Sequence, residues 1–236
     1  ERNRLIAIDT ANPAKDKWQT LIAESDALLQ QVSLVNGQFV ASYLRDARSE
    51  IKLFDAAGQP KQDIALPGLG TATGFDGAVE DKETFFGFGS WAVPDTVYRL
   101  DLTTGTTSVF KAPTVKFNLD DYETTQVFYP SKDGTKVPMF ITAKKGFVRD
   151  GNHPTILYGY GGFNIAVTPK FSPAIVEWME LGGVYAVANL RGGSEYGRSW
   201  HEGGMKLNKQ NVFDDFAAGA EYLIAEKVTQ PSKLAI

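Results

Sequence analysis

The stretch Thr155–Asn164 reads Thr-Ile-Leu-Tyr-Gly-Tyr-Gly-Gly-Phe-Asn and is the most informative part of the sequence. An apolar run ends abruptly at Gly159, and Gly161 and Gly162 follow almost at once. Glycine allows the backbone to turn sharply and to come close to another group. In α/β enzymes such a turn lies at the carboxyl end of a strand, where ligands bind. The stretch therefore predicts an α/β domain with a functional loop after this strand.

The residues around this stretch alternate between predicted strands and helices, and this alternation favours a mainly parallel sheet. Asn211 is the expected N-cap of the second helix, and Gly182 closes the first helix. In the second helix Asp214 and Asp215 are expected in the first turn, where the helix dipole favours them. Its buried face is expected to comprise Val212, Phe213, Phe216, Ala220, Leu223 and Ile224. The expected elements are a hairpin at 124–142, strands at 155–158, 184–190 and 233–236, helices at 172–181 and 211–226, and a loop at 191–204.

The first half of the chain shows a repeat. Asp9, Asp55 and Asp101 each follow an apolar strand, and successive aspartates lie 46 residues apart. Four strands fit between Asp55 and Asp101, at 61–66, 71–75, 83–89 and 96–101. A period of about 40–50 residues with four strands is typical of a β-propeller blade. A β-sandwich with evenly spaced hairpins is the alternative. We expect the aspartates to bond their own backbone as turn formers.

The repeat accounts for about two and a half blades, which is too few for a closed propeller. We therefore predict two domains, with propeller blades at 1–114 and part of an α/β-hydrolase domain at 115–236. Both ends of the chain fall inside predicted strands. These ends lead us to expect an internal fragment of a longer protein.

Composition excludes several classes of function. The net charge of −4 gives no basic excess for nucleic acid, and no apolar run approaches the ~18 residues that a membrane span needs. The chain has no cysteine and only two histidines, so thiolate and histidine-rich metal sites are excluded. We expect no metal and no cofactor.

The serine motif of α/β hydrolases, Gly-x-Ser-x-Gly, is absent. Ser194 has one residue too many before the next glycine, and His201 is expected to brace its loop. Tyr160 occupies the position from which the loop after the third strand supplies an oxyanion donor. A phenol can donate to a developing oxyanion. From residue chemistry alone, a core tyrosine on a glycine-rich turn fits equally well.

Five long stretches of the sequence carry a family resemblance. They are Val-Phe-Tyr-Pro-Ser-Lys-Asp-Gly-Thr-Lys-Val-Pro-Met-Phe (127–140), Tyr-Gly-Tyr-Gly-Gly-Phe-Asn (158–164), Ala-Val-Ala-Asn-Leu-Arg-Gly-Gly-Ser-Glu-Tyr-Gly (186–197), Trp-His-Glu-Gly-Gly (200–204) and Asn-Lys-Gln-Asn-Val-Phe-Asp-Asp-Phe (208–216). With these stretches the chain resembles the prolyl oligopeptidase family of serine peptidases. The resemblance is strong over about 120–236 and looser over the repeat. At 162–164, Gly-Phe-Asn favours the prolyl-specific branch over the oligopeptidase B type.

The resemblance implies a seven-bladed propeller that caps an α/β-hydrolase domain. Members of the family cleave short peptides after proline with a Ser-His-Asp triad. Tyr160 matches the oxyanion-hole tyrosine, and Phe163 matches an aromatic residue that lines the proline subsite. In the family the nucleophile follows the strand that begins at Leu234, so the triad is expected beyond Ile236. We expect this chain alone to be inactive.

The resemblance also sets expectations for partners. Short proline-containing peptides are the expected ligands of a monomeric parent enzyme, with no nucleic acid or membrane partner. The expected location is cytoplasmic, with a periplasmic or secreted parent as the alternative. The alternative function is a propeller plus α/β module that binds peptides without cutting them.

Overall fold

The computed structural model describes all 236 residues, which form two compact units. Unit 1 comprises residues 1–88 and 96–112, and unit 2 comprises residues 89–95 and 113–236. Residues 89–95 connect two strands of unit 1 along the chain but pack with unit 2. No helix is long and apolar enough to cross a membrane.

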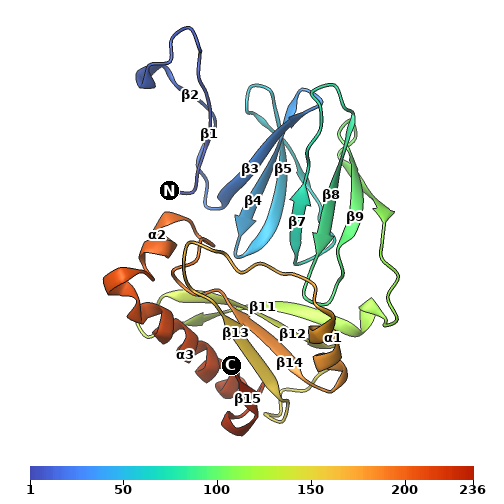
Figure 1. Ribbon diagram of the computed structural model, residues 1–236, viewed down its shortest axis with the longest axis vertical. Coiled ribbons are helices and arrows are strands. Elements are labelled where there is room, and N and C mark those ends of the chain that lie inside the picture. The colour runs from blue at the N-terminus through green and yellow to red at the C-terminus, as the bar shows by residue number, and fades with distance from the viewer. The chain divides into compact units, whose positions relative to one another are not determined.

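Unit 1 contains two four-stranded antiparallel sheets that follow one another along the chain (Figure 1). Their strand orders are β3-β4-β5-β6 and β10-β9-β8-β7, and a two-stranded sheet of β1 and β2 precedes them. The elements are β1 (Leu5–Ala7), η1 (Lys15–Lys17), β2 (Gln19–Ile22), β3 (Leu28–Val35), β4 (Gln38–Arg45), β5 (Arg48–Asp55), β6 (Pro60–Ile64), β7 (Thr71–Gly74), β8 (Glu83–Gly89), β9 (Thr96–Asp101) and β10 (Thr106–Lys111).

The two four-stranded sheets share one hydrophobic core. Alternate residues of a strand point to the same face, and in β5 this face carries Ile51 and Leu53. Phe86 of β8 belongs to the same core and stacks on Phe75 with ring centroids 4.7 Å apart. The alternating pattern of the sequence therefore builds sheets that pack face to face.

The repeated aspartates form the turns that the sequence predicts. The Asp55 Oδ1 atom accepts hydrogen bonds from the Ala57 and Gln59 amides at 2.9 and 2.8 Å. Asp9 and Asp101 make equivalent bonds, to the amides of residue 11 and of residues 103 and 104. The prediction that these carboxylates are turn formers is confirmed.

The predicted strands of unit 1 are confirmed, but the repeat and the sheets are offset by one strand. Asp55 ends β5, the third strand of the first sheet, and its turn leads to β6 in the same sheet. The sheet boundary therefore falls after β6 and not at the aspartate. Sequence spacing gives the length of the repeat, whereas strand pairing sets where each sheet begins.

Unit 2 is built on a five-stranded sheet with the order β11-β12-β14-β13-β15. Strands β14, β13 and β15 are parallel, as predicted, whereas β11 and β12 extend the sheet with antiparallel pairing. The sheet is therefore mixed and not mainly parallel.

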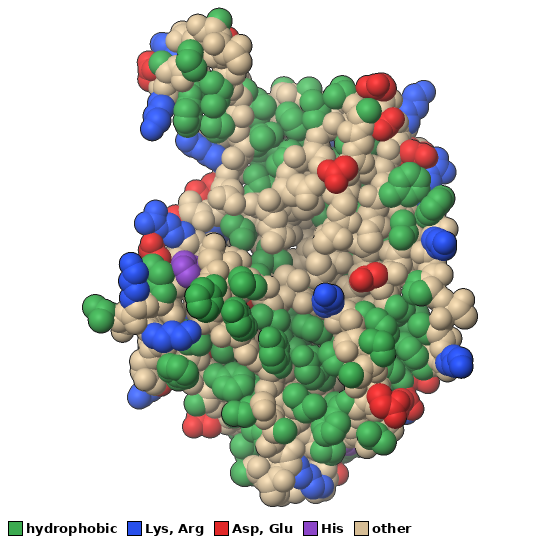
Figure 2. All heavy atoms as spheres, in the orientation of Figure 1, with side chains coloured by type: hydrophobic (Ala, Val, Ile, Leu, Met, Phe, Trp, Pro, Cys, Tyr) green, Lys and Arg blue, Asp and Glu red, His purple; other side chains and the backbone are tan.

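Figure 2 shows hydrophobic side chains on the surface where β13 and β15 lie in Figure 1. The elements are η2 (Leu119–Asp121), β11 (Tyr122–Pro130), β12 (Lys136–Lys144), β13 (Thr155–Gly159), α1 (Pro173–Glu180), β14 (Val184–Ala188), α2 (Arg198–Glu202), η3 (Lys206–Asn208), α3 (Gln210–Ala225), η4 (Pro231–Lys233) and β15 (Leu234–Ala235).

The helices of unit 2 correct four expectations. Helix α3 begins at Gln210 and has no acidic residue in its first turn, so Asp214 and Asp215 do not lie there. The predicted loop at 191–204 contains the short helix α2. Asn211 is not the N-cap of α3, because it lies inside the helix and donates through Nδ2 to the Gly203 carbonyl at 2.9 Å. Phe213 is 59% exposed, whereas Asp215 is fully buried. The buried face of α3 follows Val212, Asp215, Gly219 and Leu223.

Candidate functional site

The glycine loop, residues 159–164, follows β13, the third strand of the unit 2 sheet along the chain. Three of its residues have a positive φ, namely Gly161 (59°), Phe163 (53°) and Asn164 (57°). Glycine adopts this conformation freely and asparagine tolerates it, but it is uncommon for a bulky residue. The loop therefore holds Phe163 in a strained backbone conformation, and such strain is typical of functional sites.

Gly161 is required by close packing as well as by its φ. A Cβ atom at this position would lie 2.4 Å from Val212 Cγ1 and 2.8 Å from Leu190 Cβ. Both neighbours are buried, so neither can move aside cheaply. The glycine loop therefore packs directly on the start of α3 and on the chain just after β14.

Replacing Gly161 with alanine is expected to lower the free energy of unfolding of unit 2 by about 1–3 kcal/mol, because the new methyl group overpacks this contact. Gly162→Ala is the matched control, since the nearest atom to its Cβ would be Lys209 Nζ at 3.9 Å. Urea unfolding followed by circular dichroism measures both variants. Equal stability of the two would contradict the packing described for Gly161.

Hydrogen bonds hold the glycine loop at its middle and at its C-terminal end. The Lys209 Nζ donates to the Gly161 carbonyl at 2.8 Å, and the Asn164 amide donates to the Gly192 carbonyl at 3.1 Å. His201 Nδ1 lies 2.8 Å from the same Gly192 carbonyl oxygen. The expectation that His201 braces its loop is confirmed. Lys209 had no predicted role, and no sequence pattern connects it with the loop.

Tyr160 and Phe163 project from the glycine loop, with exposed fractions of 44% and 84%. Their ring centroids lie 6.4 Å apart with the planes tilted by 34°. Tyr160 is therefore not a core residue, and its hydroxyl makes no hydrogen bond within the described chain. An exposed aromatic ring and a free phenolic donor stand side by side.

Tyr160 borders a cavity of about 390 Å³ within unit 2. Trp91 forms part of its wall and packs edge-on against Tyr185, with ring centroids 5.6 Å apart. Lys170 is the one cationic residue of the lining. The lining residues are Trp91, Tyr158, Tyr160, Ile165, Ala166, Val167, Thr168 and Lys170. The free phenol of Tyr160 therefore stands at the edge of a mostly apolar hollow.

Ser194 and His201 do not form a nucleophile and base pair. No hydrogen bond joins them, and His201 Nδ1 faces the Gly192 carbonyl. A nucleophile and its base must lie within hydrogen-bond reach. The expectation that Ser194 is not a nucleophile agrees with this arrangement.

A buried ion pair behind the loop was missed by sequence reasoning. Arg191 is 7% exposed and donates through Nη2 and Nε to Asp215, with shortest N···O distances of 2.6 and 3.0 Å. Its Nη1 donates to Asp133 Oδ2 at 2.6 Å. Hydrogen bonds from Arg191, with one from the Thr135 amide, hold the pKa of Asp133 well below its usual range. Arg191 follows the predicted apolar strand 184–190 directly, which is the one local feature that could have indicated burial.

Glu195 is a second buried group that the sequence did not reveal. Its Oε1 atom accepts from the Val167 amide at 3.0 Å and from Asn189 Nδ2 at 3.3 Å. Burial raises the pKa of Glu195, and these hydrogen bonds only partly oppose the rise. Glu195 therefore ties residue 167, in the cavity wall beside Tyr160, to the chain that follows β14.

Two family profiles match this chain. Residues 1–113 match the profile described as "Prolyl oligopeptidase, N-terminal beta-propeller domain", and residues 169–236 match the "Prolyl oligopeptidase family". These matches agree with the two four-stranded sheets of unit 1 and the mixed sheet of unit 2. The predicted partial propeller followed by part of an α/β-hydrolase domain is confirmed.

Curated relatives match nearly the whole chain. The prolyl endopeptidase of Elizabethkingia meningoseptica is 44% identical over 233 residues, which cover 99% of this chain and 33% of the relative. The prolyl endopeptidase of Dictyostelium discoideum is 40% identical over 247 residues, covering 99% of this chain and 32% of the relative. The chain thus spans about a third of the length of these relatives.

Solved structures agree with both units. A structure from a study of two prolyl endopeptidases superimposes with a TM-score of 0.94 at 45% identity, covering 100% of this chain and 35% of that one. Prolyl oligopeptidase B of Galerina marginata was solved bound to a 35mer hydrolysis and macrocyclization substrate. It superimposes with a TM-score of 0.91 at 37% identity, covering 100% of this chain and 34% of that one. Because the profiles, the relatives and the solved structures agree, the chain belongs to the prolyl oligopeptidase family.

Proposed function

We propose that this chain supplies the oxyanion donor, Tyr160, and one wall of the proline pocket, Phe163, to a serine endopeptidase that cleaves short peptides on the carboxyl side of proline. The observation that carries the proposal is the Tyr160 hydroxyl, which has no hydrogen-bond partner. It lies on the glycine loop after β13, and hydrogen bonds from Lys209 and to Gly192 hold this loop in place. Relatives named prolyl endopeptidase, and a relative solved with a 35mer hydrolysis and macrocyclization substrate, support peptides as the substrate class.

The proposed chemistry is acyl transfer. A serine Oγ attacks the carbonyl carbon of the proline residue, and the carbonyl oxygen gains negative charge. The Tyr160 O–H then donates to that oxygen, where a donor at about 2.7–3.1 Å is most effective. The sequence holds no Gly-x-Ser-x-Gly, so the nucleophile is not among these residues. The chain by itself is not expected to hydrolyse peptides.

The domain boundaries belong to the same proposal. Residues 1–114 would be the C-terminal blades of the propeller, and residues 115–236 the first part of the catalytic domain. The monomeric state and the cytoplasmic location expected from the resemblance stay predictions. A peptide-binding module without catalysis is not favoured, since the relatives carry peptidase names.

The proposed activity is tested with the complete protein and a pair of chromogenic peptides that differ only in proline or alanine at the cleaved position. We expect hydrolysis after proline to dominate, and covalent labelling by a serine-directed phosphonate to abolish it. Absence of labelling together with absence of hydrolysis would overturn the peptidase assignment.

Replacing Phe163 with alanine is expected to lower kcat/KM for the proline peptide by roughly 10- to 200-fold, because an apolar pocket contact is worth about 1–3 kcal/mol. A flat ring suits the pyrrolidine of proline in shape and in burial. The alanine peptide should change far less. Phe128→Ala, at an exposed phenylalanine of β11, is the matched control. Equal losses for both peptides would contradict the pocket assignment.

A further inference from the structure

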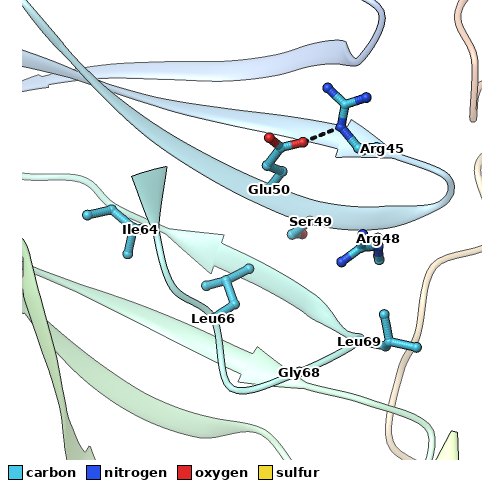
Figure 3. A pocket seen from close by; sticks show the side chains of 8 residues that line it. All are labelled: Arg45, Arg48, Ser49, Glu50, Ile64, Leu66, Gly68 and Leu69. Atoms are coloured by element: carbon cyan, nitrogen blue, oxygen red, sulfur yellow. Dashed lines mark hydrogen bonds and ion pairs between the residues drawn. The ribbon is translucent and has the colours of Figure 1, made fainter. Parts of the chain in front are cut away.

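A second cavity lies within unit 1, where the hairpin of β4 and β5 meets the connection from β6 to β7 (Figure 3). It has a volume of about 470 Å³. The lining residues are Arg45, Arg48, Ser49, Glu50, Ile64, Leu66, Gly68 and Leu69. None of them belongs to the glycine loop or to its packing partners.

Arg48 is the unusual group in this cavity. Its Nε atom is closed off from solvent and has no hydrogen-bond acceptor, and its guanidinium makes no ion pair within the described chain. A buried donor left without an acceptor costs about 1–3 kcal/mol, and more when it is charged. Native structures rarely leave such a donor unpaired, so the guanidinium points to a missing acceptor.

The turn before Arg48 fixes its position. Arg45 and Arg48 pair across the end of the hairpin, and the two residues between them, Asp46 and Ala47, have φ values of 50° and 63°. Two left-handed residues in a two-residue hairpin turn usually require asparagine or glycine. Here the second is a fully buried alanine. The strained turn places Arg48 at the start of β5.

The other charged residues of the cavity are already paired. Arg45 Nη1 and Nη2 donate to the two carboxylate oxygens of Asp26 at 2.8 Å each, and Arg45 Nε donates to Glu50. Lys52 also contacts Glu50, at 2.9 Å. Burial would raise the pKa of Glu50, but the hydrogen bonds from Arg45 and Lys52 outweigh it and leave the pKa lowered. Arg48 is therefore the uncompensated charge of the lining.

Hydrogen bonds to Ser49 hold the apolar side of the cavity in place without a ligand. The Ser49 amide donates to the Gly70 carbonyl at 3.0 Å, and Ser49 Oγ accepts from the Ala72 amide at 2.9 Å. These bonds hold the connection that carries Leu66 and Leu69. In Figure 3 Arg48 and Ser49 lie on the side of the β4–β5 hairpin that faces these leucines, whereas Arg45 and Glu50 point toward each other on its opposite side.

We propose that this cavity binds the C-terminal carboxylate of a peptide that ends in an aliphatic residue. A guanidinium binds a carboxylate through two parallel N–H···O bonds. The aliphatic side chain would lie against Ile64, Leu66 and Leu69. A doubly charged phosphate fits less well, because Arg48 offers one free positive charge and Glu50 lies in the same lining. The proposal does not depend on the peptidase activity.

The test is calorimetric titration of the full chain with Gly-Gly-Leu as the free acid and as the C-terminal amide. The acid is expected to bind at least tenfold more tightly than the amide, and Arg48→Gln should remove this difference. Arg48→Lys keeps the positive charge but not the planar guanidinium. This variant should retain part of the affinity difference between the acid and the amide. Arg4→Gln, at an exposed arginine of the same unit outside this cavity, is the matched control and should bind as the unmodified chain does.

Equal affinity of acid and amide for the unmodified chain would overturn the proposal, whether or not the Arg48 variants fold. Unchanged acid binding by a folded Arg48→Gln variant would overturn it too. Inorganic phosphate that displaces the acid at a lower concentration than acetate does would contradict the carboxylate assignment.

Discussion

Replacing Asp215 with alanine is expected to lower the free energy of unfolding of unit 2 by about 3–5 kcal/mol. Asp215 is completely buried and accepts from the Arg191 amide as well as from its guanidinium. Its removal leaves a buried arginine with only Asp133, which is half exposed, as an acidic partner. An uncompensated buried charge is far more costly than the loss of a surface pair.

The neighbouring residue provides a matched control. Asp214 is partly exposed and accepts from Gln210 Nε2 at 3.0 Å. Asp214→Ala is therefore expected to change the free energy of unfolding by no more than about 0.5 kcal/mol. Urea unfolding followed by near-ultraviolet circular dichroism compares the two variants. Similar losses for both would show that the Arg191–Asp215 pair does not stabilise unit 2 as argued.

This ion pair also bears on the candidate site. The Arg191 carbonyl oxygen would lie 3.0 Å from a Cβ atom on Gly161, so Arg191 belongs to the wall against which the glycine loop packs. The Asp215 variant should therefore disturb the glycine loop as well as the core. We expect both Asp215→Ala and Gly161→Ala to alter the loop that carries Tyr160.

Much of the fold could be predicted because its determinants are local. Alternation of apolar residues predicts strands, and a carboxylate that bonds its own backbone predicts turns such as the one at Asp55. The glycine loop is recognisable for the same reason, since its turn depends on residues within the loop. The sequence alone therefore singles out the glycine loop, whereas the roles of Tyr160 and Phe163 come from the family resemblance and stay predictions.

The features that could not be predicted from the sequence depend on contacts between residues that are distant along the chain. Arg191 and Asp215 are separated by 24 positions, and only tertiary packing brings them together. Phe213 was expected inside because it is apolar, but burial of Asp215 turns α3 so that Phe213 faces outward. Helix α2 is a single short turn that depends on its surroundings more than on its own sequence.

The cavity around Arg48 was invisible in the sequence for a related reason. Its lining comes from the β4–β5 hairpin, from the end of β6 and from the connection that follows β6. A single arginine at the start of a strand is usually a solvated residue. Only the structure shows that its Nε atom is buried without an acceptor.

Replacing Tyr160 with phenylalanine in the complete enzyme is expected to lower kcat by roughly 10²–10³, because one oxyanion donor is lost. KM should change little, since the ring remains and the hydroxyl acts on charge that develops only in the transition state. Tyr158→Phe is the matched control. Tyr158 has the same exposed fraction, 44%, and lines the same cavity. It lies in β13 and precedes the glycine loop.

The role of Tyr160 is tested by the kcat of the Tyr160→Phe enzyme relative to that of the Tyr158→Phe enzyme, measured with a saturating proline peptide. We expect a ratio of roughly 10⁻² to 10⁻³ with closely similar KM values. A ratio near one would show that the Tyr160 hydroxyl does not stabilise the oxyanion and that the tyrosine only supports the loop.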